Sequence, residues 1–85
     1  MKNYFEEICK KLKKEIKIED ILIVDNSHKH RGHKFFSSEK LHLHLKIRSL
    51  YLNSLSRVNA QKIIMKILRN DLKTRIHALE ISIEK

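Results

Sequence analysis

The chain has 85 residues, of which 41% are hydrophobic, with no proline and one glycine. This length and composition predict a single small domain over residues 1–85 with a modest core, and they exclude long linkers and low-complexity tails. The formal net charge of +9, from 19 Lys and Arg against 10 Asp and Glu, predicts attraction to polyanions, whether or not that is the protein's task.

Residues 3–17 are predicted to form an amphipathic helix, because apolar side chains recur there every three or four residues. The stripe consists of Phe5, Ile8, Cys9, Leu12 and Ile16. Most lysines of this segment fall outside the stripe. Glu6 and Glu7 lie early in the helix and the lysines lie late, which suits the dipole of a helix.

Cys9 is the only cysteine, so no disulfide can form within the chain. Its place in the apolar stripe favours a buried thiol, and a lone thiol suits a reducing compartment. No apolar run reaches the roughly 18 residues that a membrane span needs, and the first residues lack the apolar core of a signal peptide. We therefore expect a cytoplasmic protein that makes no membrane contact.

Two strands joined by a long loop are predicted next. The apolar run at residues 21–24 predicts a short strand whose two faces are both at least partly covered. Residues 41–48 alternate between apolar and polar side chains, which is typical of a sheet with one packed face and one wetter face. His42 and His44 fall on the wetter face, where we expect surface or structural roles. The two strands are expected to form a hairpin.

The second half of the chain is predicted to hold a connector, a long helix and a last strand. The connector, residues 49–56, contains a short helical turn at 50–52, and Ser56 is a candidate N-cap. An apolar stripe predicts a helix over residues 57–74, and residues 76–83 read as a strand.

His77 shares its parity in the last strand with Leu79, Ile81 and Ile83, which predicts that its ring points toward the packed face or its rim. The element order is then α-β-β-(short α)-α-β. This order predicts an α+β fold with a three-stranded sheet and helices packed on one face. The crossover through the long helix allows the last two strands to be parallel.

Three of the six histidines, His28, His30 and His33, lie within six residues of the long loop, beside the only glycine. From the residues alone, two interpretations stay open for this loop: a solvated basic loop and a loose metal-binding loop. For His77, a structural hydrogen bond and a ligand role likewise both stay open.

Three segments, in the right order, resemble the BolA-like family over nearly the whole chain. Residues 25–33 resemble the family's Ser-His-x-His-x-Gly-His loop. His42, with Lys46, Ile47 and Ser49, resembles the family's Thr-His-Phe strand and the serine that ends it. Residues 76–79, Ile-His-Ala-Leu, match the Ile/Val-His-Ala-Leu ending, which is the most specific of the three.

The resemblance implies a fold like a type II KH domain and a partner, a monothiol glutaredoxin of the CGFS type. In that family the heterodimer holds a [2Fe–2S] cluster, for which the glutaredoxin and glutathione supply thiolates. The histidine ligands carried over to this chain are His77 and, from the loop, His33, with His30 as the second candidate. We expect a non-enzymatic adaptor for iron–sulfur cluster trafficking or iron-linked regulation, and no cluster bound by the isolated chain.

Basic side chains on the long helix allow two interpretations, contact with phosphates or an ordinary solvated face. They are Lys62, Lys66, Arg69, Lys73 and Arg75. The alternative function is therefore a DNA-binding transcriptional regulator that uses this helix and the adjacent strand edge. Against it, residues 60–62 read Ala-Gln-Lys and residues 52–54 read Leu-Asn-Ser, where the family has Arg-His-Arg and Phe-x-Gly.

An enzymatic role is not expected. A phosphate-binding loop needs more than one glycine, and a cysteine–histidine dyad would need Cys9 to leave its apolar stripe.

Overall fold

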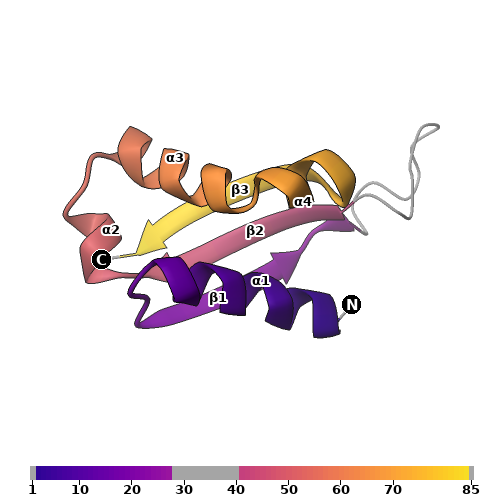
Figure 1. Ribbon diagram of the computed structural model, residues 1–85, viewed down its shortest axis with the longest axis horizontal. Helices are drawn as coiled ribbons and strands as arrows, with labels where there is room; N and C mark the ends of the chain where they lie inside the picture. Colours follow the sequence, from indigo (N-terminus) through magenta and orange to yellow (C-terminus); the bar gives the residue numbers. More distant parts are fainter. Residues whose placement is uncertain (1, 28–40, 85) are drawn as a thin grey trace.

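The computed structural model describes residues 2–27 and 41–84. These residues form four helices and three strands (Figure 1). In chain order the elements are α1 (Lys2–Glu15), β1 (Asp20–Asp25), β2 (Leu41–Arg48), α2 (Leu50–Asn53), α3 (Arg57–Ile67), α4 (Arg69–Thr74) and β3 (Ile76–Glu84).

The three strands form one sheet in the order β1-β2-β3. Strand β1 pairs with β2 in antiparallel register, and β2 pairs with β3 in parallel register. Both the predicted hairpin and the predicted crossover are therefore confirmed. Helices α1, α3 and α4 cover the same face of the sheet (Figure 1), as expected for the predicted α+β fold.

The core lies between the helices and the inner face of the sheet. The strict alternation of β2 is confirmed, because its apolar side chains are all buried while its three histidine and lysine side chains stay partly exposed. The largest fully buried apolar side chains are Ile8, Leu12, Leu45, Ile47, Leu52, Ile64, Leu68 and Ile76. Burial of these side chains is the main source of stability.

The buried stripe of α1 is rotated relative to the prediction. Tyr4, which the periodicity did not select, is buried, whereas Phe5 and Cys9 are only half-buried. The expectation of an enclosed Cys9 was wrong, because this side of α1 faces the edge of the sheet near β1, where Cys9 lines a shallow groove with Ile21 and Leu22. Partial burial still raises the pKa of its thiol.

The predicted helix 57–74 is present as two segments, α3 and α4, separated by Leu68. The backbone of Leu68 leaves helical geometry, with φ −96° and ψ 19°. Hydrogen bonds from Leu68 N to Ile64 O and from Leu72 N to Leu68 O nevertheless continue across it. The helical run is thus locally distorted rather than interrupted. At its start, Ser56 accepts a hydrogen bond from Asn59 N at 3.1 Å, which confirms the predicted N-cap.

Ser49 joins three elements at one end of the fold. Its side chain is fully buried, donates to Lys17 O just beyond α1 at 2.7 Å and accepts from Leu52 N at 3.2 Å. The hydroxyl therefore caps α2 and ties the end of β2 to the segment between α1 and β1.

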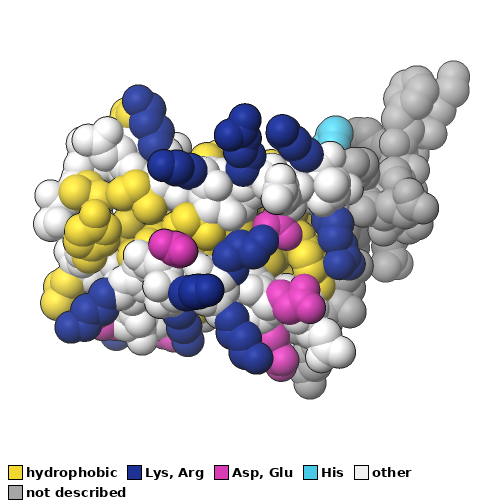
Figure 2. All heavy atoms as spheres, in the orientation of Figure 1, with side chains coloured by type: hydrophobic (Ala, Val, Ile, Leu, Met, Phe, Trp, Pro, Cys, Tyr) yellow, Lys and Arg dark blue, Asp and Glu magenta, His cyan; other side chains and the backbone are white. Residues whose placement is uncertain are grey.

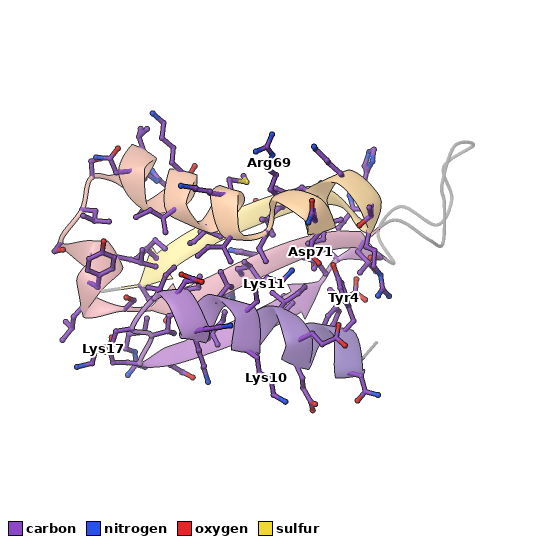
Figure 3. All side chains as sticks on the ribbon, in the orientation of Figure 1. Tyr4, Lys10, Lys11, Lys17, Arg69 and Asp71 are labelled. Atoms are coloured by element: carbon purple, nitrogen blue, oxygen red, sulfur yellow. The ribbon has the colours of Figure 1, made fainter. Side chains whose placement is uncertain are left out.

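Asp71 joins α1 to α4. Its carboxylate is 8% exposed, accepts from the Tyr4 hydroxyl at 2.6 Å and from Lys11 Nζ at 2.7 Å (Figure 3). The Arg75 guanidinium lies 3.8 Å from the centroid of the Tyr4 ring. Burial by itself raises the pKa of Asp71, but the hydrogen bonds from Lys11 and Tyr4 outweigh burial and hold this pKa below its ordinary value. Burial and the hydrogen bond to Asp71 raise the pKa of Tyr4.

We predict that Ser49→Ala lowers the free energy of unfolding by about 1–3 kcal/mol, because it leaves the buried N–H of Leu52 and the partly buried carbonyl of Lys17 without their partner. Urea unfolding followed by circular dichroism measures this change. Ser54→Ala is the matched control, since that hydroxyl caps an exposed turn by donating to Tyr51 O. We expect the control to stay within about 0.5 kcal/mol of the parent. Equal losses in both variants would contradict the joining role of Ser49.

We predict that Asp71→Asn lowers the free energy of unfolding by about 1.5–3 kcal/mol near neutral pH. The pKa of Asp71 is lower in the folded state, so its stabilisation is present above the ordinary carboxyl pKa of about 3.9 and is lost as the pH falls through the folded-state pKa. The difference between parent and variant should therefore shrink on acidification, as measured by urea unfolding from pH 7 to pH 3.

Tyr4→Phe is the control for this pH dependence, because it keeps the carboxylate and its pair with Lys11. This variant should be less stable than the parent and yet keep most of the parent's sensitivity to acid. If the stability of Asp71→Asn followed that of the parent in parallel down to pH 3, the charge of Asp71 would have no stabilising role.

Candidate functional site

His77 is the second residue of β3, and its side chain is exposed. The two loop histidines that the resemblance selects, His33 and His30, lie outside the described residues, as does His28. Their ligand role therefore stays a prediction.

A β-bulge at the start of β3 explains why His77 is exposed. Leu41 pairs with Ile76, but the next residue of β2, His42, pairs with Ala78, so His77 is an extra residue with no direct partner. Side chains of a strand point alternately toward and away from the core, and the extra residue of a bulge shifts this alternation by one position. Ile76 is therefore buried before the bulge, and Leu79 faces the core after it. The parity argument, which pointed His77 toward the packed face or its rim, was therefore wrong about the packed face, because His77 is exposed.

The ring of His42 lies beside the ring of His77. The two ring centroids are 5.1 Å apart, and the ring planes are tilted by 53°. Sequence reasoning placed His42 on the wetter face correctly but missed this pairing. A signal was present: each histidine is the second residue of its strand, directly after a buried apolar residue, and the two strands are parallel neighbours.

Hydrogen bonds hold the backbone around His42. Its N–H donates to Ser27 Oγ at 3.1 Å, and its carbonyl accepts from Asn26 N at 2.7 Å. One residue earlier, Leu41 N donates to Arg75 O at 2.8 Å, which fixes the start of β2 against the corner before β3. The described residues that flank residues 28–40 thus meet at the end of the sheet that carries the two histidines (Figure 1).

His44, on the same outer face, has a structural role. Its Nε2 lies 2.7 Å from Ser82 Oγ, and its Nδ1 lies 3.0 Å from a carboxylate oxygen of Glu80. Both ring nitrogens therefore face partners on β3, and the expectation of a surface or structural role is confirmed for this residue. His44 is a natural control for any experiment on His42 and His77.

The five basic residues of the alternative interpretation do not act as one group. Lys62, Lys66 and Arg69 line a shallow groove of about 490 Å³ together with apolar Val58 and Met65. Figure 2 shows Lys and Arg side chains spread over several elements, next to an exposed hydrophobic patch at the α2 end.

The last two members of that group are placed differently. Lys73 is exposed near the end of α4, whereas the guanidinium of Arg75 covers the Tyr4 ring. The first three thus share one surface, and Arg75 belongs to the contact with α1.

Within residues 2–27 and 41–84, no three His, Cys, Asp or Glu side chains are grouped so that they could hold a metal ion. The helices of this part of the chain are too short or too polar to serve as a membrane span.

Most of the chain matches one known protein family. The family described as "BolA-like protein" matches residues 12–85. The chain belongs to the BolA-like family. The family match includes all three segments with histidines, at residues 25–33, at His42 and at His77.

A curated relative of this BolA-like chain is "Protein BOLA1, chloroplastic" from Arabidopsis thaliana, which is 30% identical over 84 residues. The match covers 95% of this chain but 52% of the relative, so the chain spans about half the length of that protein. The relative is chloroplastic, and the cytoplasmic location expected for this chain stays a prediction.

Solved structures agree on the fold. The BolA domain of SufE1 from Arabidopsis thaliana has a TM-score of 0.77 and 32% identity, with 93% of this chain and 87% of that chain covered. BolA1 from the same plant has a TM-score of 0.76 and 28% identity, with 92% and 86% covered. A bol-like protein from Babesia bovis, at 13% identity, shares the fold, with a TM-score of 0.69 over 92% of this chain and 79% of that one.

Proposed function

We propose that this BolA-like chain is a non-enzymatic adaptor that binds a monothiol CGFS glutaredoxin and co-ligates a bridging [2Fe–2S] cluster, for cluster trafficking or iron-linked regulation. The observation that carries the proposal is the exposed ring of His77, which the β-bulge turns out of the core. His77 lies at the end of the sheet where the described flanks of residues 28–40 meet. Residues 28–40 contain His33 and His30, the expected first and second candidates for the other ligand.

The donor set of the chain fits one half of such a site. Neutral imidazole is a suitable ligand for iron, and histidine in place of thiolate raises the potential of a [2Fe–2S] centre. The only thiol of the chain, Cys9, is half-buried on α1, where burial raises the pKa of the thiol, and one thiol cannot supply the set of thiolates that a [2Fe–2S] cluster needs. The sulfur ligands must therefore come from the glutaredoxin and glutathione, and the chain's own task is to present imidazoles.

We predict that mixing the chain with a cluster-loaded CGFS glutaredoxin changes the visible absorption and circular dichroism of the cluster, because a histidine ligand replaces a thiolate. His77→Ala should abolish this change, since the variant removes the nitrogen donor. His44→Gln is the control and should keep the full change, because His44 is engaged by Ser82 and Glu80. If His77→Ala gave the same change in visible absorption and circular dichroism as the parent, the proposal would be wrong.

A second candidate, a DNA-binding transcriptional regulator, is favoured by one observation. Lys62, Lys66 and Arg69 are exposed along a single face of α3 and the start of α4. Such a row can contact successive phosphates, and each phosphate contact steepens the dependence of affinity on salt.

For this candidate we predict that a duplex selected from a random pool binds at least about 10³-fold more tightly than its scrambled version at physiological salt. Lys66→Ala should lower the slope of log affinity against log salt by about one, as measured by fluorescence anisotropy. Equal affinities for the two duplexes, with a steep salt dependence, would leave only the attraction expected from a charge of +9.

A further inference from the structure

We propose that the groove between α1 and α3, at the α2 end of the molecule, binds an acidic amphipathic helix of a partner protein other than the glutaredoxin. The binding itself needs neither the glutaredoxin nor the cluster. Only its consequence, that an adaptor holds this second protein while the glutaredoxin is bound, rests on the proposed function.

The groove has an apolar floor. Its volume of about 770 Å³ is in the range of ligand-binding sites. Ile16 is buried in the floor, while Ile63 and Ile67 are half-buried. Figure 2 shows the hydrophobic surface exposed between α1 and α3 at the α2 end, with Lys and Arg side chains around it. Removal of this apolar surface from water favours association with a partner.

Helix α2 turns large apolar side chains toward solvent beside the groove. Leu52 is buried, but Leu50 is 77% exposed and Tyr51, which lines the groove, is 49% exposed. The Ser49 cap and the hydrogen bond from Ser54 Oγ to Tyr51 O, at 2.6 Å, hold this short helix. A tyrosine presented in this way suits an interface, because its ring offers a large contact area with few rotatable bonds to fix. Tyr51 is therefore the expected anchor.

The rim of the groove is basic. Lys11, Lys17 and Lys66 line it, against one carboxylate, that of Glu15. Lys11 binds Asp71. In the described part of the chain, neither Lys17 nor Lys66 pairs with a carboxylate. Two exposed ammonium groups beside an apolar floor complement a partner whose apolar stripe is flanked by Asp or Glu. A second copy of this chain is disfavoured, because two basic rims would meet.

The walls of the groove favour a helical occupant over an extended one. Helices α1 and α3 lie side by side (Figure 1), and their backbone groups are hydrogen-bonded within each helix. An extended segment in the groove would find no strand edge to pair with, whereas a helix satisfies its own backbone. On the α1 side the lining residues fall within residues 11–17, so the partner contributes roughly two to three turns.

The groove and His77 lie at opposite ends of β3 (Figure 1). Asn53 Nδ2 donates to Glu84 O at 2.6 Å, which ties α2 to the last residue of that strand. His77 is the second residue of the strand, and at about 3.3 Å per residue the two positions are roughly 23 Å apart. Two proteins can therefore occupy the two ends at the same time.

Selection from a displayed peptide library tests the groove. The library holds helical peptides of about 16 residues, with large apolar residues at positions i, i+3, i+4 and i+7 and with Glu, Lys or Gln varied on the flanks. Selection on the full chain should enrich Glu over Lys on the flanks. The best peptide, labelled with fluorescein, is then titrated by anisotropy. A selection that enriches no peptide, or that favours Lys on the flanks, overturns the inference.

Two matched pairs of variants locate the binding. Tyr51→Ala should weaken binding of the best peptide at least about tenfold, whereas Val58→Ala, an exposed apolar residue outside the groove, should change it less than about twofold. Lys66→Glu should weaken binding at least about fivefold. Lys10→Glu is its control, because Lys10 is exposed on the side of α1 that faces away from α3 (Figure 3). It should weaken binding less than about twofold.

A charge swap shows whether Lys66 touches the peptide. Each glutamate of the best peptide is replaced by lysine in turn, and one replacement should restore affinity for Lys66→Glu while weakening binding to the parent. If Tyr51→Ala failed to fold, this swap and the Lys10→Glu control would decide alone. Equal losses for Lys66→Glu and Lys10→Glu, with no restoring replacement, would leave only attraction to a charge of +9 and overturn the inference.

Two other occupants of the groove give distinct results. Sedimentation velocity could show a dimer that Tyr51→Ala converts to a monomer, which would assign the groove to a second copy of the chain. Vesicles of phosphatidylglycerol and phosphatidylcholine could bind the parent but not Tyr51→Ala, with no peptide enriched, which would assign the groove to a lipid surface. Either result overturns the inference.

Cluster transfer separates this inference from the proposed function. Tyr51→Ala, or an excess of the peptide, should leave the glutaredoxin-dependent spectral change unaltered, and His77→Ala should bind the peptide like the parent. If the peptide abolished the spectral change, the glutaredoxin itself would use the groove and the inference would be wrong. Peptide binding without any spectral change refutes the proposed function alone. A normal spectral change without any selected peptide refutes the inference alone.

Discussion

The parallel pairing of β2 with β3 is the constraint on which the rest of the molecule depends. The two strands are far apart in sequence, and the helical crossover through α3 and α4 brings them side by side. The hydrogen bond from Leu41 N to Arg75 O sets where the pairing begins. Shifting the register by one residue would exchange the two faces of β3, so the buried isoleucines and the exposed His77 are specified together.

Two sets of polar contacts hold α1 in place. Within the helix, Tyr4 in the first turn and Lys11 in the second half both bind the buried carboxylate of Asp71 on α4. Beyond its end, the Lys17 carbonyl accepts from Ser49, the residue that follows β2. Hydrophobic burial is non-directional, whereas a hydrogen bond to a buried group is satisfied in one geometry only. These contacts therefore select one arrangement of helices that apolar packing alone would leave less defined.

Local patterns in the sequence were sufficient to predict most of the fold. The alternation of residues 41–48, the N-cap at Ser56 and the hairpin follow from short-range rules of periodicity and capping, and the structure agrees with each. The family resemblance also rests on short segments, at residues 25–33, 42–49 and 76–79, and the match to the BolA-like family confirms it.

Features that depend on contacts between distant segments could not be predicted from those patterns. Ile76, which pairs with Leu41, faces the core, and so do Leu79 and Ile81 further along β3. A regular strand would point even- and odd-numbered residues to opposite faces, so the bulge at His77 is needed to bring all three into the core. Burial of Tyr4 in place of Phe5 depends on a carboxylate 67 residues away. Periodicity counts only neighbours in sequence, so it had no means of detecting either contact.

The outer face of the sheet carries histidines in two different settings, one engaged by side chains of β3 and one exposed to solvent. On the outer face, His44 is engaged by Ser82 and Glu80 and joins β2 to β3, while two residues away His42 lies beside an exposed His77. Identical side chains thus have different surroundings because the strand pairing gives them different neighbours. The residue that the bulge leaves without a direct partner in the pairing lies outside the core, so the start of β3 carries an exposed histidine at little cost to core packing.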